Sequence, residues 1–344
     1  MYFLSSLALI AATVLTSLYF AFDYNPKGQE KIINWTKSIP YSEQFTSVIE
    51  KDPNKDFTIL NIADLHVSDF EGPGENKKTK ELLQHLIDIT NPDLITLTGD
   101  QIWTDHSKNA LLREIRWLES FEIPWAPVFG NHDNEGTANL VWQSTRLEDA
   151  KHCLYKRGPS NIGPLGNYVV NIEENGKIFK SLYMLNLGTD DNFTQEQIDF
   201  VEWNANGNKA KNNNVYPEGM CFFHKAINAF NKAWRNYQYD NSIAIGDVYR
   251  SFYIADSDCG NEFFEMAKSI NVTDIVCGHQ HGNHFTIPYE GVRLTFALKT
   301  GDNVSIYEDD ENPDAYIVGA TSITLFGENV NYTSNYVGKE YTLD

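Results

Sequence analysis

The stretch from Trp125 to Gly136 reads WAPVFGNHDNEG, an apolar run that ends in an amide, an imidazole and a carboxylate. Runs of this kind, bounded by glycine and polar residues, are typical of buried strands. Binding sites in open α/β sheets form beyond the carboxyl ends of such strands. The stretch therefore predicts a strand that carries Asn131, His132 and Asp133 to the edge of a sheet. These side chains gain chemical meaning only if similar residues end other strands.

Four other apolar runs also end in side chains that can bind metals. They are FTILNIAD at 57–64, NPDLITLTGD at 91–100, MCFFHKA at 220–226 and VTDIVCGHQHGNHF at 272–285. Leucine and isoleucine recur at helical spacing in 76–90 and 109–121, so helices separate the first three strands. Strand and helix in alternation predict an α/β fold. The five polar clusters then lie beyond the carboxyl ends of strands.

The rest of the chain is expected to add further strands and helices. Residues 167–188 predict a hairpin about Asn175 and Gly176, a pair that favours tight turns. Thr194 is an N-cap candidate for a helix that ends before a polar loop at 204–216. The remaining expected elements are a short helix at 262–270 and strands at 291–301 and 314–327.

The five clusters together contain two carboxylates, one amide oxygen and five imidazoles as candidate groups. They are Asp64 with His66, Asp100, Asn131 with His132, His224, and His279 with His281. Nitrogen and oxygen ligands without thiolates suit divalent Mn, Fe or Zn. Two metal ions about 3.5–4 Å apart need a bridging carboxylate and roughly three further ligands each, and this inventory meets that need. Each residue alone has an ordinary explanation, such as a helix cap for Asp64, but their order and placement together favour a binuclear metal centre.

The motifs D-x-H, G-D, G-N-H-D, a lone histidine and G-H-x-H, in this order, resemble the signature of the calcineurin-like metallophosphoesterases. The resemblance covers residues 57–328. The segments LITLTGDQIW, VFGNHDNEG, FFHKAI and GHQHGNHF look closest to the purple-acid-phosphatase-like phosphohydrolases. The resemblance implies an α/β fold, a four-layer α/β/β/α sandwich with two mixed sheets and the site at its rim.

The resemblance also implies a role for each motif residue. Asp64, His66 and His281 would hold one divalent metal ion, Asn131, His224 and His279 would hold the other, and Asp100 would bridge both. His132 would lie beside the scissile phosphate as an acid or charge stabiliser, with Asp133 orienting its ring. A water made acidic by the two ions would supply the bridging hydroxide that attacks phosphorus.

Trp103 departs from the pattern of true purple acid phosphatases, which have a tyrosine three residues after the bridging aspartate. Tryptophan cannot ligate iron. The chain keeps the histidine of D-x-H, His66, which purple acid phosphatases lack, so the two differences compensate in ligand number. The sequence therefore predicts no tyrosinate charge-transfer colour and no requirement for ferric iron.

Four polar residues near the motifs are weaker candidates. His106 and His284 could touch the substrate phosphate or the leaving group, although hydrogen-bonded loop histidines are the ordinary expectation. Lys225 and Lys299 could add positive charge, although solvated loop lysines are more common. None of the four is included in the predicted metal set.

The chain has 344 residues and a formal net charge of −20 at pH 7. A protein this acidic repels polyanions, which argues against nucleic acid and anionic membrane surfaces as partners. A small phosphate ester or a phosphoprotein can still be the substrate, because a bound metal reverses the field locally. The oligomeric state stays open.

The first 22 residues are predicted to be a signal peptide or a signal anchor, with a buried helix as the third alternative, because residues 3–22 carry no charge. The first two alternatives place the chain in the secretory pathway. It would be secreted, lie in a vesicular or lysosome-like lumen, or be held by a single-pass anchor with a luminal or extracellular catalytic domain. The other predicted parts are a linker and edge segment at 23–56, the phosphoesterase domain at 57–328 and a peripheral tail at 329–344. Glycosylation sequons occur at Asn34, Asn192, Asn271, Asn303 and Asn331.

Four cysteines, Cys153, Cys221, Cys259 and Cys277, allow three disulfide pairings, and the sequence does not choose between them. No CxxC pair is present, which argues against a zinc ribbon. Cys221 and Cys277 lie in apolar runs and are expected to be buried free thiols.

The leading functional expectation is a metal-dependent phosphomonoesterase, that is, a phosphatase. One alternative keeps the same metals but cleaves a diester, as sphingomyelinase-like or cyclic-nucleotide members of the family do. The other is a non-catalytic scaffold, as in relatives resembling the retromer subunit, but the presence of His132 and all seven candidate ligands argues against it. Loops at 68–76, 134–165 and 204–218 are expected to set substrate selectivity.

Overall fold

The computed structural model describes residues 32–68, 75–188, 192–250, 254–255, 259–301, 315–327 and 329–338. The uncharged segment at 3–22, predicted as a signal peptide or anchor, lies outside these residues, as does the part of the predicted linker before residue 32. Within the described part of the chain, no helix is both long and apolar enough to cross a membrane. The fold is that of the second of two compact units, Ile33–Asp344.

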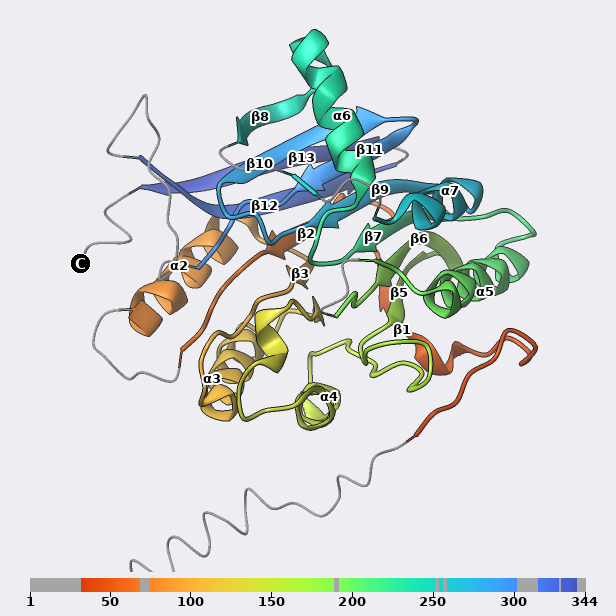
Figure 1. Cartoon of the computed structure of the whole chain (residues 1–344), viewed down its shortest axis with the longest axis horizontal. Helices are drawn as coiled ribbons and strands as arrows, with labels where there is room; N and C mark the ends of the chain where they lie inside the picture. The colour runs from red at the N-terminus through yellow and green to blue at the C-terminus, as the bar shows by residue number, and fades with distance from the viewer. Residues whose placement is uncertain are drawn as a thin grey trace, which may run out of the picture. The chain divides into compact units, whose positions relative to one another are not determined.

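Two mixed β-sheets form the middle of this unit (Figure 1). The eight-stranded sheet (sheet A) has the strand order β1 (Thr46–Glu50), β5 (Tyr168–Glu174), β6 (Lys177–Met184), β7 (Glu218–Phe222), β9 (Val272–Cys277), β11 (Val292–Phe296), β10 (Asn283–Tyr289) and β8 (Ile245–Arg250). The five-stranded sheet (sheet B) has the order β13 (Asn329–Gly338), β12 (Ala315–Phe326), β2 (Phe57–Ile62), β3 (Leu94–Thr98) and β4 (Trp125–Val128). Both sheets mix directions: β7 runs parallel to β9, whereas β10 runs antiparallel to β11, and in sheet B β2 runs parallel to β3 but antiparallel to β12.

Alternation of apolar side chains along sheet A shows how the layers stack. Val170 and Ile172 of β5 belong to the core shared with sheet B, whereas Val169 belongs to the core under the helices on the other face. The helices over sheet A are α5 (Gln195–Lys211), α6 (Asn228–Tyr239) and α7 (Asn261–Ser269), and those on the side of sheet B are α2 (Glu75–Thr90), α3 (Ser107–Ser120) and α4 (Leu140–Asp149). The order is therefore α/β/β/α, which confirms the predicted four-layer sandwich.

Most strands and helices predicted from apolar periodicity are present. The hairpin between β5 and β6 turns at Asn175 and Gly176, which both have positive φ as this tight turn requires. Thr194 caps α5 in a capping box with Gln197. The structure also contains α4, α6 and β8, which no sequence pattern predicted.

The predicted loop at 204–216 is wrong in its first half, because α5 continues to Lys211. The polar residues that suggested a loop include side chains that are buried and hydrogen bonded. Asn208 Nδ2 donates to Asn171 Oδ1 and to Ser181 Oγ, each at 3.0 Å. A polar run indicates a loop only when its side chains face water, whereas here partners on sheet A satisfy them.

The segments on either side of the predicted phosphoesterase domain both join the sheets. β1 pairs in parallel with β5 at one edge of sheet A, and Trp35 packs edge-on to Trp203 of α5 with ring centroids 5.8 Å apart. At the other end of the chain, β13 pairs antiparallel with β12 at an edge of sheet B. The tail predicted as peripheral is therefore an edge strand as far as Gly338, and its Tyr332 is buried.

All four cysteines are free thiols, and Cys221 and Cys277 are buried as expected. Burial raises the pKa of both thiols above the ordinary value. Thiols in this state carry little thiolate at neutral pH and are chemically inert.

A buried charge cluster ties sheet A to sheet B. The Asp274 carboxylate on β9 is fully buried, and Arg293 on β11 donates to it through Nε at 2.6 Å and Nη2 at 2.8 Å. Tyr332 on β13 donates its hydroxyl to Asp274 Oδ1 at 2.7 Å. Because β13 belongs to sheet B, the cluster links the two sheets while giving each carboxylate oxygen a charged partner.

Replacing Asp274 with alanine should strongly destabilise the protein. The change leaves the Arg293 guanidinium without its carboxylate, and breaking such a buried pair costs up to about 3–5 kcal/mol. Urea unfolding of Asp274→Ala measures the loss. The control is Lys37→Ala, which removes an exposed ion pair with Glu202 and should change stability little. A loss for Asp274→Ala as small as that of the control would contradict a structural role for the cluster.

Candidate metal centre

The carboxyl ends of five parallel strands bring predicted ligands together. β2, β3 and β4 run parallel in sheet B, and β7 and β9 run parallel in sheet A. Within three residues after these strands lie, in strand order, Asp64, Asp100, Asn131, His224 and His279. Although Asp64 and His279 are 215 positions apart, the His279 N–H donates to Asp64 Oδ2 at 3.1 Å. The strand-end placement inferred from the sequence thus becomes proximity in space.

Two groups of three side chains are arranged as metal ligands are. Asp64, His66 and His281 form the first triad, and Asp100, His224 and His279 form the second, with the ligand atoms of each triad within 4.8 Å of one another. In the first triad, His281 Nε2 lies 3.4 Å from Asp64 Oδ1. In the second, His279 Nδ1 lies 3.1 Å from His224 Nε2. Six of the seven residues predicted as ligands therefore fall into two clusters, and their role as ligands stays a prediction.

Asp100 lies between the two triads. Its Oδ2 is 3.7 Å from His66 Nε2 in the first triad and 3.0 Å from His224 Nε2 in the second. A carboxylate placed in this way can bridge two metal ions. The bridging role that the sequence resemblance implied stays a prediction.

The side-chain oxygen of Asn131 is available as a metal ligand. Its side-chain oxygen is buried and has no hydrogen-bond partner among the residues that the structure describes. A buried oxygen left unsatisfied costs about 1–3 kcal/mol, and a divalent ion would satisfy it. Carboxylates, imidazoles and one amide oxygen form a ligand set that suits Mn, Fe or Zn. The residues present therefore fit two divalent ions.

The backbone of several candidate ligands is strained. Asp64, His66, Asp100 and His279 all have positive φ, between 49° and 75°. Residues with a side chain seldom adopt this left-handed region, and each instance costs on the order of 1 kcal/mol or more. Backbone hydrogen bonds hold the strained loops, as from the His66 N–H to the Asp100 carbonyl at 3.0 Å. The surrounding fold therefore holds these residues in their strained conformation.

Close approach of the loops requires glycine at two positions. A Cβ on Gly130 would lie 2.2 Å from Asp100 Oδ1, and a Cβ on Gly99 would lie 2.7 Å from His224 Nδ1. Contacts this short do not occur in folded proteins. The glycines of the G-D and G-N-H-D motifs thus leave room for the Asp100 carboxylate and the His224 ring.

Burial and neighbouring charges both shift the pKa values of the candidate ligands. Burial disfavours the charged form of Asp64, but His281 and His224 outweigh it and hold the pKa of Asp64 below the ordinary value. Burial lowers the pKa of His66 and the pKa of His279 to about 4 each. These two rings are therefore neutral near pH 7, which is the form of imidazole that binds metals.

Asp133 does not orient His132, contrary to the prediction from the sequence. Its carboxylate is fully buried and accepts backbone N–H groups. Oδ1 accepts from Gln101 at 2.9 Å and from Ile102 at 3.0 Å, and Oδ2 accepts from Gly130 at 2.6 Å. The carboxylate thereby joins the loop after β3 to the loop after β4, and each of these loops carries a candidate ligand.

Glu135, which the sequence motifs did not single out, holds the ring of His132. The short 3-10 helix η2 (His132–Asn134) places Glu135 one turn after His132, and His132 Nδ1 lies 2.8 Å from Glu135 Oε2. The ring also stacks on Trp103, with centroids 4.7 Å apart. His132 Nε2 lies 3.9 Å from Asp100 Oδ2, so this nitrogen faces the triads. An acidic residue three positions after a histidine is the sequence signal that could have identified Glu135.

The four weaker candidates lie outside both triads. Lys299 is buried, and its ammonium group donates to the backbone carbonyl of Asp64 at 2.8 Å. His284 is also buried, whereas His106 is exposed and Lys225 is half-buried. Lys299 therefore supports the backbone of a candidate ligand, a role that differs from the solvated lysine expected from the sequence.

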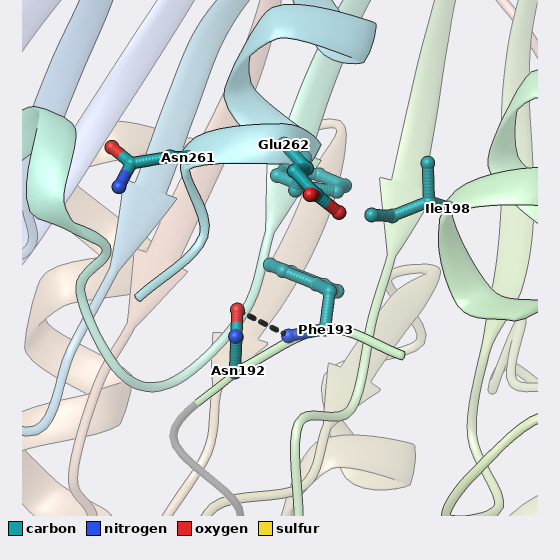
Figure 2. A pocket seen from close by; sticks show the side chains of 6 residues that line it. Asn192, Phe193, Ile198, Asn261 and Glu262 are labelled. Carbon is teal, nitrogen blue, oxygen red and sulfur yellow. Dashed lines mark hydrogen bonds between the residues drawn. The ribbon is translucent and has the colours of Figure 1, made fainter. Parts of the chain in front are cut away.

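A separate pocket of about 260 Å³ lies beside the first turns of α5 and α7 (Figure 2). The residues that line it are Asn192, Phe193, Ile198, Asn261, Glu262 and Phe263. Figure 2 shows the Asn192 side-chain oxygen accepting a hydrogen bond from the backbone N–H of Phe193. No candidate ligand is among these residues, so the pocket is not part of the metal centre.

Glu114 of α3 is a buried carboxyl group next to Asp133. Both of its oxygens are buried, and neither has a hydrogen-bond partner in the described part of the chain. Burial, and to a lesser extent the charge of Asp133, hold the pKa of Glu114 well above its ordinary value of 4.5. Burial and the Asp100 charge likewise raise the pKa of Asp133 to about 7. Glu114 is therefore neutral in the folded protein at pH values where exposed glutamates are charged.

Replacing Glu114 with glutamine should change the free energy of unfolding differently at two pH values. The variant should gain stability relative to the wild type as the pH rises from 4.5 to 7. Below its unfolded pKa, near 4.5, the group is protonated in both states and titration contributes nothing. As the pH rises above that value, the carboxyl ionises only in the unfolded state. The wild type then loses up to about 1.4 kcal/mol per pH unit until the folded pKa is reached. Glutamine does not titrate and escapes this loss.

Thermal unfolding of the wild type and Glu114→Gln at both pH values is the measurement. Glu81→Gln, at an exposed position of α2, is the matched control. A stability difference for Glu114→Gln that stays constant with pH would argue that Glu114 is not a buried neutral acid.

The chain resembles known proteins in both sequence and fold. The family model of the calcineurin-like phosphoesterases matches residues 57–283, well over half of the chain. Phosphatase DCR2 of Saccharomyces cerevisiae is 33% identical over 150 residues, which are 37% of this chain and 25% of that protein. The "Probable inactive purple acid phosphatase 28" of Arabidopsis thaliana is 26% identical over 287 residues, 69% of this chain and 68% of that protein. The chain thus matches a quarter of the length of the yeast relative.

The fold also occurs among solved structures. GAP50, described as the anchor in the inner membrane complex of Plasmodium, superposes with a TM-score of 0.50 at 11% identity, over 83% of this chain and 85% of that chain. At this identity the likeness concerns the fold alone. The family model, the order of the five motifs and the four-layer sandwich agree with one another, and the fold implies a binuclear metal centre. The chain belongs to the calcineurin-like phosphoesterase family, with relatives that include purple-acid-phosphatase-like proteins.

Proposed function

We propose that the protein is a phosphomonoesterase that depends on two divalent metal ions. The observation that carries the proposal is the pair of triads with Asp100 between them and His132 Nε2 facing them. Family membership and the name of the yeast relative, a phosphatase, support it. The substrate is a small phosphate ester or a phosphoprotein.

Seven side chains would hold the metal ions. They are Asp64, His66 and His281 for one ion, Asn131, His224 and His279 for the other, and Asp100 for both. Bound Mn, Fe or Zn would polarise the phosphate oxygens and make a water acidic enough to serve as nucleophile near neutral pH. The strained loops hold these ligands in place, so binding requires little rearrangement.

His132 is the residue that handles a proton in this proposal. As the water oxygen bonds to phosphorus and the P–O bond to the leaving group breaks, protonated Nε2 gives its proton to the leaving oxygen, which departs as an alcohol. The contact of Glu135 with Nδ1 keeps the ring turned so that Nε2 faces the triads. Asp133 acts at a distance from this step, through the loops that it joins.

The His132→Ala variant should lose about 10²- to 10⁴-fold in kcat while keeping its metal content. The ring supplies a proton but is not among the candidate ligands. The variant should therefore lose activity without losing metal. Turnover of p-nitrophenyl phosphate and metal analysis of the same preparation are the measurements. His152→Ala, at a histidine beside Trp125 at the start of β4 and away from the strand ends that carry the candidate ligands, is the control and should keep full activity. Full activity of His132→Ala would remove His132 from the mechanism.

A non-catalytic role is the second candidate, because the Arabidopsis relative is named inactive. The presence of His132 and all seven candidate ligands in this chain argues for activity. Well-folded protein that binds no metal and hydrolyses no ester would favour the non-catalytic role. Faster hydrolysis of bis-p-nitrophenyl phosphate than of the monoester would instead favour a phosphodiesterase with the same ligands.

We also propose that the protein acts in the secretory pathway, with residues 1–22 as a cleaved signal or an anchor. The uncharged segment at 3–22 supports this location. N-terminal sequencing and fractionation of the protein from its own cells test it. A protein that begins at Met1 and stays in the cytosol would contradict the proposal.

A further inference from the structure

Trp103 is exposed beside the candidate metal centre. Its exposed fraction is 42%, and of the seven tryptophans in the chain, all within described ranges, it is the one that belongs to the exposed residues. Four of the others are at most 9% exposed, and two are half-buried. A single exposed apolar side chain is ordinary on a protein surface. The residues around Trp103 indicate a function for its exposed ring.

Both the backbone and the ring of Trp103 are held in place. Its N–H donates to the Val67 carbonyl at 3.3 Å, next to the bridge between Val67 and Ile102. The indole stacks on His132 with an angle of 30° between the rings, and it lies edge to face with His66 at 5.3 Å between centroids. The indole is thus a rigid apolar surface that adjoins the proposed acid and the first triad.

The leaving group of the substrate is the part that would meet this surface, a step that rests on the proposed function. If His132 Nε2 protonates the leaving oxygen, the leaving group departs on the side of His132. Trp103 stacks on that same ring, so the departing group passes next to the indole. A flat aromatic group can pack against an indole, whereas a short aliphatic alcohol offers little surface for such contact.

Charge around the same ring disfavours an anionic leaving group. The side chain of Glu135, which meets the other nitrogen of His132, is 54% exposed. A leaving group with carboxylates or further phosphates would be repelled, whereas an uncharged one would not.

We propose that Trp103 selects phosphate monoesters whose leaving group is flat, aromatic and uncharged. Aryl alcohols and nucleosides share this chemistry. Trp103 is a specificity-determining residue in this scheme, because it contacts the leaving group and takes no part in holding the metals. The phosphate itself is recognised by the triads for any monoester, so the contribution of Trp103 is a preference among monoesters.

Three substrates separate this preference from general activity. Phenyl phosphate carries an aryl group, uridine 5′-monophosphate carries a nucleoside, and 2-glycerophosphate carries a short aliphatic alcohol. Trp103→Ala should lower the ratio of kcat/KM for an aromatic ester to that for 2-glycerophosphate by about tenfold, and Trp103→Phe should retain most of it. Loss on phenyl phosphate alone identifies an aryl group, and loss on the nucleotide identifies a nucleoside. Tyr239→Ala, at a tyrosine that is 93% exposed on α6, should leave every ratio unchanged.

Equal loss on all three esters would overturn the proposal, because it would show that the indole acts only by supporting His132. An unchanged ratio in Trp103→Ala would overturn it as well, because the indole would then not touch the leaving group.

A binding measurement tests the contact with Trp103 separately from the proposed esterase activity. Phenylphosphonate and methylphosphonate are not hydrolysed, and titration calorimetry on the metal-loaded wild type and Trp103→Ala compares their affinities. Tighter binding of phenylphosphonate that is lost in Trp103→Ala supports contact with Trp103, even if no ester is turned over. Equal affinity of the two phosphonates for the wild type would refute the contact, whatever the esterase activity.

Discussion

The carboxylate of Asp133 joins two of the loops that carry candidate metal ligands, the loop after β3 and the loop after β4. It is buried, and it accepts backbone N–H groups of Gln101 and Ile102 on one loop and of Gly130 on the other. Three hydrogen bonds to one buried side chain hold the two loops together. The position of Asp100 relative to the loop after β4 follows from this link. The chemistry of the site therefore depends on a side chain that lies behind it.

Packing beneath the site keeps its strained residues in place. Four of the candidate ligands have positive φ, a conformation that is unfavourable in an isolated chain. They persist because each follows a strand or loop held by the sheets, with apolar cores on both faces of sheet A. The Asp274 cluster adds a polar link between the sheets. The packed interior thus stabilises the strained loops at the edge of the sheets, which would not adopt this conformation in an isolated chain.

His132 connects the proposed chemistry with the proposed selectivity. Its Nε2 faces the triads, its Nδ1 meets Glu135, and its ring stacks on Trp103. Glu135 would fix the direction of the ring, and Trp103 would meet the departing alcohol. The two neighbours come from the loops that Asp133 joins, so the same link that positions Asp100 also positions both contacts of His132.

The sequence by itself determined the family, the alternation of strands and helices, and the candidate ligands, because strand ends and motif spacing are local properties of the chain. The loop expected at 204–216 failed because the polar side chain of Asn208 is satisfied by partners on sheet A, which no local pattern records. The expected role of Asp133 failed for a related reason, since two of its three donors belong to another loop. Only the tertiary structure decided that Glu135 meets His132, that Trp103 is exposed, and that strands of two sheets end at one place. These features are contacts and exposures set by the packing of distant segments, and packing is a property of the whole fold.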